Sequence, residues 1–171
     1  KIRITFLAPS RGLIGYHSQF LTETRGSGIM NRVFFGYALY KGPITGRRMG
    51  VLVSNALGST VAYSLWNLEA RGILFVGSGI KVYKGMIIGE NNRAGDLDVN
   101  PMKAKQLTNI RASSTDENIR LTTPRRFSLE QALSYIENDE LVEVTPDNIR
   151  LRKQYLDPHE RKKAMRIEST A

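Results

Sequence analysis

The sequence contains no cysteine, which excludes disulfide scaffolds, thiol catalysis and cysteine-ligated zinc or iron–sulfur sites. It also has no run of about 18 uninterrupted apolar residues, the length that a membrane-spanning helix needs. Residues 1–6 alternate polar and apolar side chains and do not form the apolar block of a signal peptide. These absences predict a cytoplasmic protein with no membrane partner.

Histidine is scarce as well, and its two copies do not make a metal or acid–base site. His17 and His159 lie far apart, and neither has paired acidic ligands at helical spacing. The carboxylates between Glu137 and Glu143 could resemble a catalytic pair, but we expect them at a solvated helix end. The sequence therefore predicts no catalytic residue and no metal ligand.

Phosphate-cradling glycine loops are missing too. No glycine is followed by lysine, so the nucleotide-binding loop G-x-x-x-x-G-K-[ST] is absent. Gly77-Ser78-Gly79 fails the dinucleotide fingerprint because Val82 occupies the third glycine position. We expect this chain to bind no small-molecule substrate and to carry no cofactor of its own.

What the sequence has in excess is positive charge. It holds 25 Lys and Arg against 16 Asp and Glu, a net charge of 25 − 16 = +9. Residues 1–95 carry 12 basic and 3 acidic side chains, whereas residues 128–147 carry six acidic side chains and no basic one. A basic excess attracts nucleic acid, although many basic domains bind none. With 41% apolar and 24% charged residues, the chain is expected to fold.

Hydrophobic periodicity predicts an α+β fold that begins with a strand-helix-strand unit. Residues 1–8 and 33–39 alternate as half-buried strands do, and residues 12–25 repeat apolar side chains at helical spacing. A unit of about forty residues cannot bury both faces of its sheet. Residues 1–42 are therefore expected to be half of a split βαβ domain or to dock on the residues that follow.

Residues 43–171 are expected to form a second domain whose hydrophobic pattern differs from that of residues 1–42. Short apolar runs at 50–54, 59–63, 73–76, 82–83 and 86–89, separated by glycine, predict a mixed, partly barrel-like sheet. One or two helical turns are expected at 65–72, a helix after the capping box of Ser128 and Gln131, strands at 141–144 and 149–151, and a basic helix at about 157–167. Residues 101–118, with low apolar content, are expected to be a long, mobile loop.

That loop mixes basic and small polar residues. Lysine and arginine neutralise phosphates, and small polar side chains contact sugars and base edges. Residues 103–115 have this mixture, but a solvated surface loop has it too. The pairs Arg47-Arg48 and Arg125-Arg126 are equally ambiguous, because no aromatic stacking platform is evident beside them.

Several motifs resemble, in their order along the chain, the C-terminal part of the BipA/TypA family. They are residues 8–15 (APSRGLIG), 71–76 (RGILFV), 82–90 (VYKGMIIGE), 105–112 (KQLTNIRA) and 139–146 (DELVEVTP). The family comprises bacterial translational GTPases related to elongation factor G. The resemblance extends from about residue 1 to about residue 163.

The resemblance implies that residues 1–42 are the second half of a ferredoxin-like domain similar to the fifth domain of elongation factor G. Residues 43–171 resemble the family's own C-terminal domain, which touches the acceptor end of tRNA on the ribosome through a flexible loop. That loop corresponds to residues 103–117. The implied RNA-binding residues are Lys103, Lys105, Asn109, Arg111, Ser113 and Ser114, with Arg47, Arg48, Arg125 and Arg126 as further candidates. Ser114 stands where the family usually has glycine, which stiffens the loop tip.

Two functions remain open at this point. One is a ribosome- and tRNA-binding part of a translational GTPase that acts in ribosome assembly or in translation under stress. The GTP-binding domain, with its GTP and magnesium, is absent from this chain, so the chain itself is not expected to be an enzyme. The other is a protein-interaction or structural domain that does not touch RNA, and the salt dependence of RNA binding distinguishes the two.

Overall fold

The computed structural model describes residues 2–42, 47, 49–104 and 119–168. Its first elements are a short 3-10 helix, η1 (Ser10–Leu13), and the helix α1 (Tyr16–Glu23). The predicted helix at 12–25 is thus divided in two, because Gly15 adopts a left-handed φ of 74° between them. A Cβ atom at Gly15 would lie 2.4 Å from Cβ of Ser134, so this turn lies directly against Ser134.

The strands predicted at 1–8 and 33–39 are wrong for the residues that the structure describes. Residues 2–9 and 27–42 contain no strand. The side chains that should alternate into a sheet are in solvent, as with Phe35 at 83% and Tyr37 at 99% exposure. A strand requires a neighbour for its backbone N–H and C=O groups, and here the two segments pair neither with each other nor with the main sheet.

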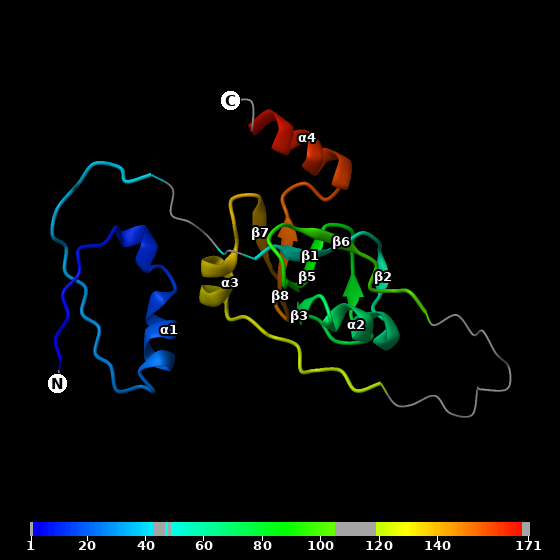
Figure 1. Cartoon of the computed structure of the whole chain (residues 1–171), viewed down its shortest axis with the longest axis horizontal. Helices are drawn as coiled ribbons and strands as arrows, with labels where there is room; N and C mark the ends of the chain where they lie inside the picture. Colours follow the sequence, from blue (N-terminus) through cyan, green and yellow to red (C-terminus); the bar gives the residue numbers. More distant parts are fainter. Residues whose placement is uncertain (1, 43–46, 48, 105–118, 169–171) are drawn as a thin grey trace, which may run out of the picture.

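A mixed sheet of six strands forms the centre of the fold within residues 51–153 (Figure 1). Its strands are β1 (Val51–Ser54), β3 (Gly72–Leu74), β5 (Met86–Asn91), β6 (Leu97–Val99), β7 (Glu140–Val144) and β8 (Ile149–Lys153). The order is β6-β1-β5-β8-β7, and β3 pairs with β5 at Gly89–Asn91, beyond the part of β5 that pairs with β8. The mixed α+β class is confirmed, but the partly barrel-like closure is not, because β6 and β7 end the sheet as open edges.

The apolar runs of β1 and β5 are continuous because both faces of the sheet are covered. On one face, Leu52 and Ile88 pack with Leu65 and Leu68 of α2 (Ala62–Glu69). Helix α2 turns into β3 at Gly72, where a Cβ atom would lie 1.7 Å from the carbonyl oxygen of Glu90. The short pair β2 (Gly58–Ser59) and β4 (Lys81–Val82) lies outside the main sheet, and Val82 joins the same core.

On the other face, Val51, Val53 and Ile87 pack with Ala132 of α3 (Leu129–Tyr135). The predicted capping box is confirmed: the Gln131 N–H donates to Ser128 Oγ at 3.2 Å, and the Ser128 N–H donates to Gln131 Oε1 at 3.0 Å. Phe75, Phe127 and Tyr135 complete this core, with ring centroids 4.8 to 5.6 Å apart.

The predicted C-terminal helix is confirmed as α4 (Pro158–Glu168). Asp157 caps it by accepting the His159 N–H at 2.8 Å, and its carboxylate also binds Lys84. Arg161 is buried and ties the helix to the sheet, since it donates to the carbonyl oxygens of Tyr155 and Leu156 and pairs with Asp98. None of the helices in the described part of the chain is long and apolar enough to cross a membrane.

Candidate nucleic-acid interface

Four of the predicted RNA-binding residues lie in the described part of the chain: Lys103, Arg47, Arg125 and Arg126. The other six fall outside the described residues; they are Arg48, Lys105, Asn109, Arg111, Ser113 and Ser114. The site must therefore be built from the two stretches that flank 105–118. We call residues 99–104 the outgoing segment and residues 119–126 the return segment.

The outgoing segment is fixed to the N-terminal end of α2. The Val61 N–H donates to the carbonyl oxygen of Pro101 at 3.0 Å, and Ser64 Oγ donates to that of Asn100 at 2.7 Å. Pro101 is almost fully buried. Lys103, two residues further along the chain, is exposed. Its charged side chain is therefore in solvent, while the backbone just before it is fixed by the hydrogen bonds of Asn100 and Pro101.

The return segment is fixed to the C-terminal end of the same helix. The N–H and the Oγ1 hydroxyl of Thr122 both donate to Oε1 of Glu69, at 2.7 and 2.6 Å. Leu121 packs on the core beside α2, and the Arg125 N–H donates to the carbonyl oxygen of Leu74 at 2.9 Å. Helix α2 therefore holds both flanks of 105–118, one at each end.

The two arginines that close the return segment have different surroundings. The Arg125 guanidinium lies 4.8 Å from the ring centroid of Phe127 and 3.5 Å from a carboxylate oxygen of Glu90. Arg126 and Arg120 are exposed. In the described residues, Lys103, Arg120 and Arg126 thus present positive charge to solvent on the two flanks of residues 105–118.

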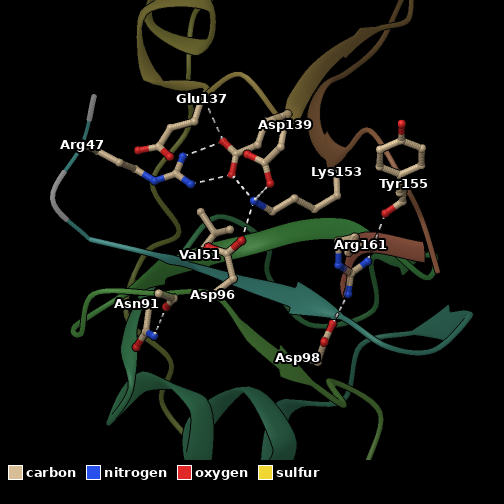
Figure 2. Close-up of polar contacts among 12 residues, drawn as sticks. Arg47, Val51, Asn91, Asp96, Asp98, Glu137, Asp139, Lys153, Tyr155 and Arg161 are labelled. Carbon is tan, nitrogen blue, oxygen red and sulfur yellow. Dashed lines mark hydrogen bonds and ion pairs between the residues drawn. The ribbon is translucent and has the colours of Figure 1, made fainter. Parts of the chain in front are cut away.

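The largely buried side chain of Arg47 points toward Glu140 (Figure 2). Its guanidinium forms a two-pronged ion pair with the buried Glu140, at 2.5 and 2.6 Å, and donates to the carbonyl oxygen of Met49 at 2.9 Å. Burial alone would lower the pKa of Arg47, but the hydrogen bonds and charge of Glu140 outweigh it and raise that pKa. Because this guanidinium is engaged, we leave Arg47 out of the proposed RNA contact.

Glu140 also belongs to a second ion pair, which sequence reasoning missed. Lys153 is buried, and its Nζ atom lies 2.5 Å from Asp96, 2.7 Å from Asp139 and 2.8 Å from Glu140. Burial opposes charge on both residues, yet the hydrogen bonds prevail: the pKa of Lys153 is raised and the pKa of Glu140 is lowered. The expectation of a solvated helix end at 137–143 is wrong for Glu140, which begins strand β7 with its carboxylate inside the protein.

No sequence signal separates these buried charges from the exposed ones; Glu140 is the first residue of β7 and Lys153 the last residue of β8. Together they join the chain ahead of β1 to β7, β8 and the turn before β6, so their role is to fix the fold. In the part of the chain that the structure describes, no group of His, Asp and Glu side chains is suited to hold a metal ion.

Comparisons with known proteins match the chain in two adjoining parts. Residues 1–48 match the family described as elongation factor G C-terminus, and residues 49–158 match the TypA/BipA C-terminal domain. These matches define the C-terminal region of a translational GTPase, and the chain contains no GTPase domain. The chain belongs to the TypA/BipA family.

Curated relatives agree with that assignment. The large ribosomal subunit assembly factor BipA of Buchnera aphidicola subsp. Schizaphis graminum is 52% identical over 171 residues, which is 99% of this chain and 28% of the relative. The protein of the same name from Bacillus subtilis is 47% identical over 172 residues, covering 100% of this chain and 28% of the relative. The chain thus spans about 28% of the length of the relatives that it matches.

Proposed function

We propose that this chain is the ribosome-docking, RNA-binding C-terminal part of a translational GTPase that acts in assembly of the large ribosomal subunit or in translation under stress. The observation that carries the proposal is the base of the 105–118 segment, where Lys103, Arg120 and Arg126 are exposed on anchored backbone. The names of the relatives, all large ribosomal subunit assembly factors, support it. A cytoplasmic location follows from the same proposal.

The proposed ligand is ribosomal RNA together with the acceptor end of tRNA. The contact set comprises Lys103, Arg120, Arg125 and Arg126 from the described flanks and Lys105, Asn109, Arg111, Ser113 and Ser114 from the segment between them. Arg48 stays a candidate on sequence alone. GTP and magnesium do not fit this chain, because its sequence has no phosphate loop; they would be bound by another part of a full-length protein.

Co-sedimentation with purified large ribosomal subunits, repeated at increasing salt, tests the proposal. If roughly four phosphates are neutralised, log K should fall with log salt at a slope of about −3 to −4. A slope near zero would contradict a phosphate contact.

That second outcome would favour a protein-interaction domain. One observation supports this alternative: apolar side chains are exposed throughout the N-terminal unit, such as Ile2 at 92%, Val33 at 88% and Leu39 at 92%. Apolar docking would depend little on salt.

A further inference from the structure

Helix α2 carries an aromatic pair on the side that faces away from the core. Ser64, Leu65 and Leu68 are buried, whereas Trp66 is 52% exposed. The ring centroids of Tyr63 and Trp66 lie 6.5 Å apart, with an angle of 39° between their planes. The outer face of a soluble helix is normally charged or polar, but the only charged residue of α2 is Glu69, at its end. Trp66 is thus exposed beside a half-buried Tyr63, and burial in the core does not explain its place there.

Exposed basic residues stand in the chain segments that are attached to the two ends of α2. Trp66 and Glu69 are three residues apart, which makes them neighbours on the helix surface. Glu69 binds Thr122, so the return segment is fixed at the helix residue that neighbours Trp66, and the exposed Arg120 stands two residues ahead of Thr122. Arg71 is exposed directly after the helix, and Lys103 follows the backbone anchored at the other end.

We propose that Tyr63 and Trp66 form a platform on which an unpaired base of single-stranded RNA stacks, while Arg71, Arg120 and Lys103 neutralise its phosphates. The proposal rests on the RNA-binding function above and deepens it by naming the part of the RNA that is recognised. Every base presents a flat π-face, so an aromatic ring beside cations accepts single strands with little dependence on sequence. The exposed Arg71, Arg120 and Lys103, in segments attached to α2, favour RNA over an apolar protein surface as the occupant.

Trp66 is the only tryptophan in the chain, so its fluorescence reports on this position alone. The 171-residue chain should be titrated with an unlabelled single-stranded RNA 12-mer and, in parallel, with inorganic polyphosphate. Both polyanions meet the basic side chains, but only the RNA has bases to stack. We expect saturable quenching of the tryptophan emission by RNA and no comparable quenching by polyphosphate.

Variants then separate base stacking from charge. W66A should weaken binding of the fluorescein-labelled 12-mer, measured by anisotropy, by about 5- to 150-fold, the range for loss of one base–aromatic stack. The slope of log K against log salt should stay unchanged, because no charge is removed. W66F should retain most of the affinity. Y155A removes an aromatic ring that is 43% exposed outside α2 and should bind like the parent.

The outcomes distinguish this proposal from the function on which it rests. If the parent binds no RNA, both fail. If the parent binds RNA with the expected salt slope but W66A binds equally well, the platform is overturned and the RNA function stands. Equal quenching by polyphosphate also overturns the platform. Should W66A fold poorly, W66F and the quenching of the parent still decide the question.

Discussion

Arg47 illustrates how a residue ahead of the sheet can be fixed by one side chain. Its guanidinium is paired with a fully buried carboxylate, and Glu140 is shared with Lys153. Removing one partner of a buried ion pair leaves a charge without full compensation. We expect R47A to lower the free energy of unfolding in urea by on the order of 3 kcal/mol.

R47K should lose less, because it keeps the positive charge and sacrifices the two-pronged geometry. R126A is the matched control, since Arg126 is exposed, and should change stability by no more than about 0.5 kcal/mol. Equal stability of R47A and the parent would show that the ion pair does not stabilise the fold.

The same cluster predicts the pH dependence of stability. The pKa of Glu140 is lower in the folded protein than its ordinary value of 4.5. Its contribution is therefore fully present above pH 4.5 and is lost as the pH falls through the folded pKa. The pKa of Lys153 is raised above 10.5, so its contribution is present below that pH and is lost as the pH rises through the folded value.

Urea unfolding from about pH 7 to about pH 3 measures the acid side of this dependence. E140Q should be less stable than the parent at neutral pH and should lose less stability on acidification. D147N alters an exposed carboxylate and should follow the parent. A steep acid limb that persists in E140Q would assign the effect to other carboxylates.

These residues also show where sequence reasoning stops. Arg47 and Glu140 are 93 positions apart in the sequence. Lys153 forms an ion pair with Asp96, which lies in the loop between β5 and β6. Neither composition nor local spacing predicts that these residues meet, so the sequence did not distinguish Arg47 from the other candidate arginines. Trp66 was overlooked for a related reason, because only the packed helix shows which of its faces is outside.

At the scale of the elements, the sequence predicts those features that depend on residues close together along the chain. The capping box at Ser128 and Gln131 depends on residues three apart, and the start of α4 depends on Asp157 and Pro158. Strand β6 was missed because it has only three residues, with Asp98 in the middle. The strands expected at 1–8 and 33–39 did not form because alternation predicts a face but supplies no neighbouring strand.

Helix α2 makes a prediction at this scale, because Glu69 joins it to the return segment. A carboxylate at the last residue of a helix is disfavoured by the helix dipole, so its place there is better explained by its two bonds to Thr122. The Thr122 amide should be protected from hydrogen exchange in the parent and should exchange faster in E69A. E69Q keeps an acceptor oxygen and should retain protection.

The comparison of E69A with E69Q isolates the hydrogen bonds, since both variants lose the same charge. Neither should lower the melting temperature greatly, because the core contacts of α2 come from Leu65 and Leu68. Rapid exchange of the Thr122 amide in the parent itself would show that the return segment is not fixed by Glu69.

At the scale of the whole molecule, the net charge of +9 combines charges buried in ion pairs with charges left in solvent. Replacing Lys103, Lys105 and Arg111 together with Glu should leave the melting temperature nearly unchanged, because the sequence predicts a solvated loop there and charges of such loops contribute little to folding. It should reduce RNA affinity severely and make the slope of log K against log salt shallower by about 3.

A control with the same change of net charge places Glu at Lys41, Lys162 and Lys163, which are exposed elsewhere. If both triple variants lose the same affinity, RNA responds to total charge and not to this site. If the first variant melts much earlier than the parent, the replaced residues are part of the packed structure.

The position of β8 has a consequence for how a ribosome must make this protein. In the described residues β8 is the last strand to be synthesised, yet it lies inside the sheet, between β5 and β7. In a nascent chain that has not reached residue 149, the edges of β5 and β7 that pair with β8 are therefore unpaired. Glu140 also lacks its ion pair with Lys153 at that stage. The main sheet cannot be completed during early translation, and a chain stalled at that stage would be a substrate for chaperones or proteases.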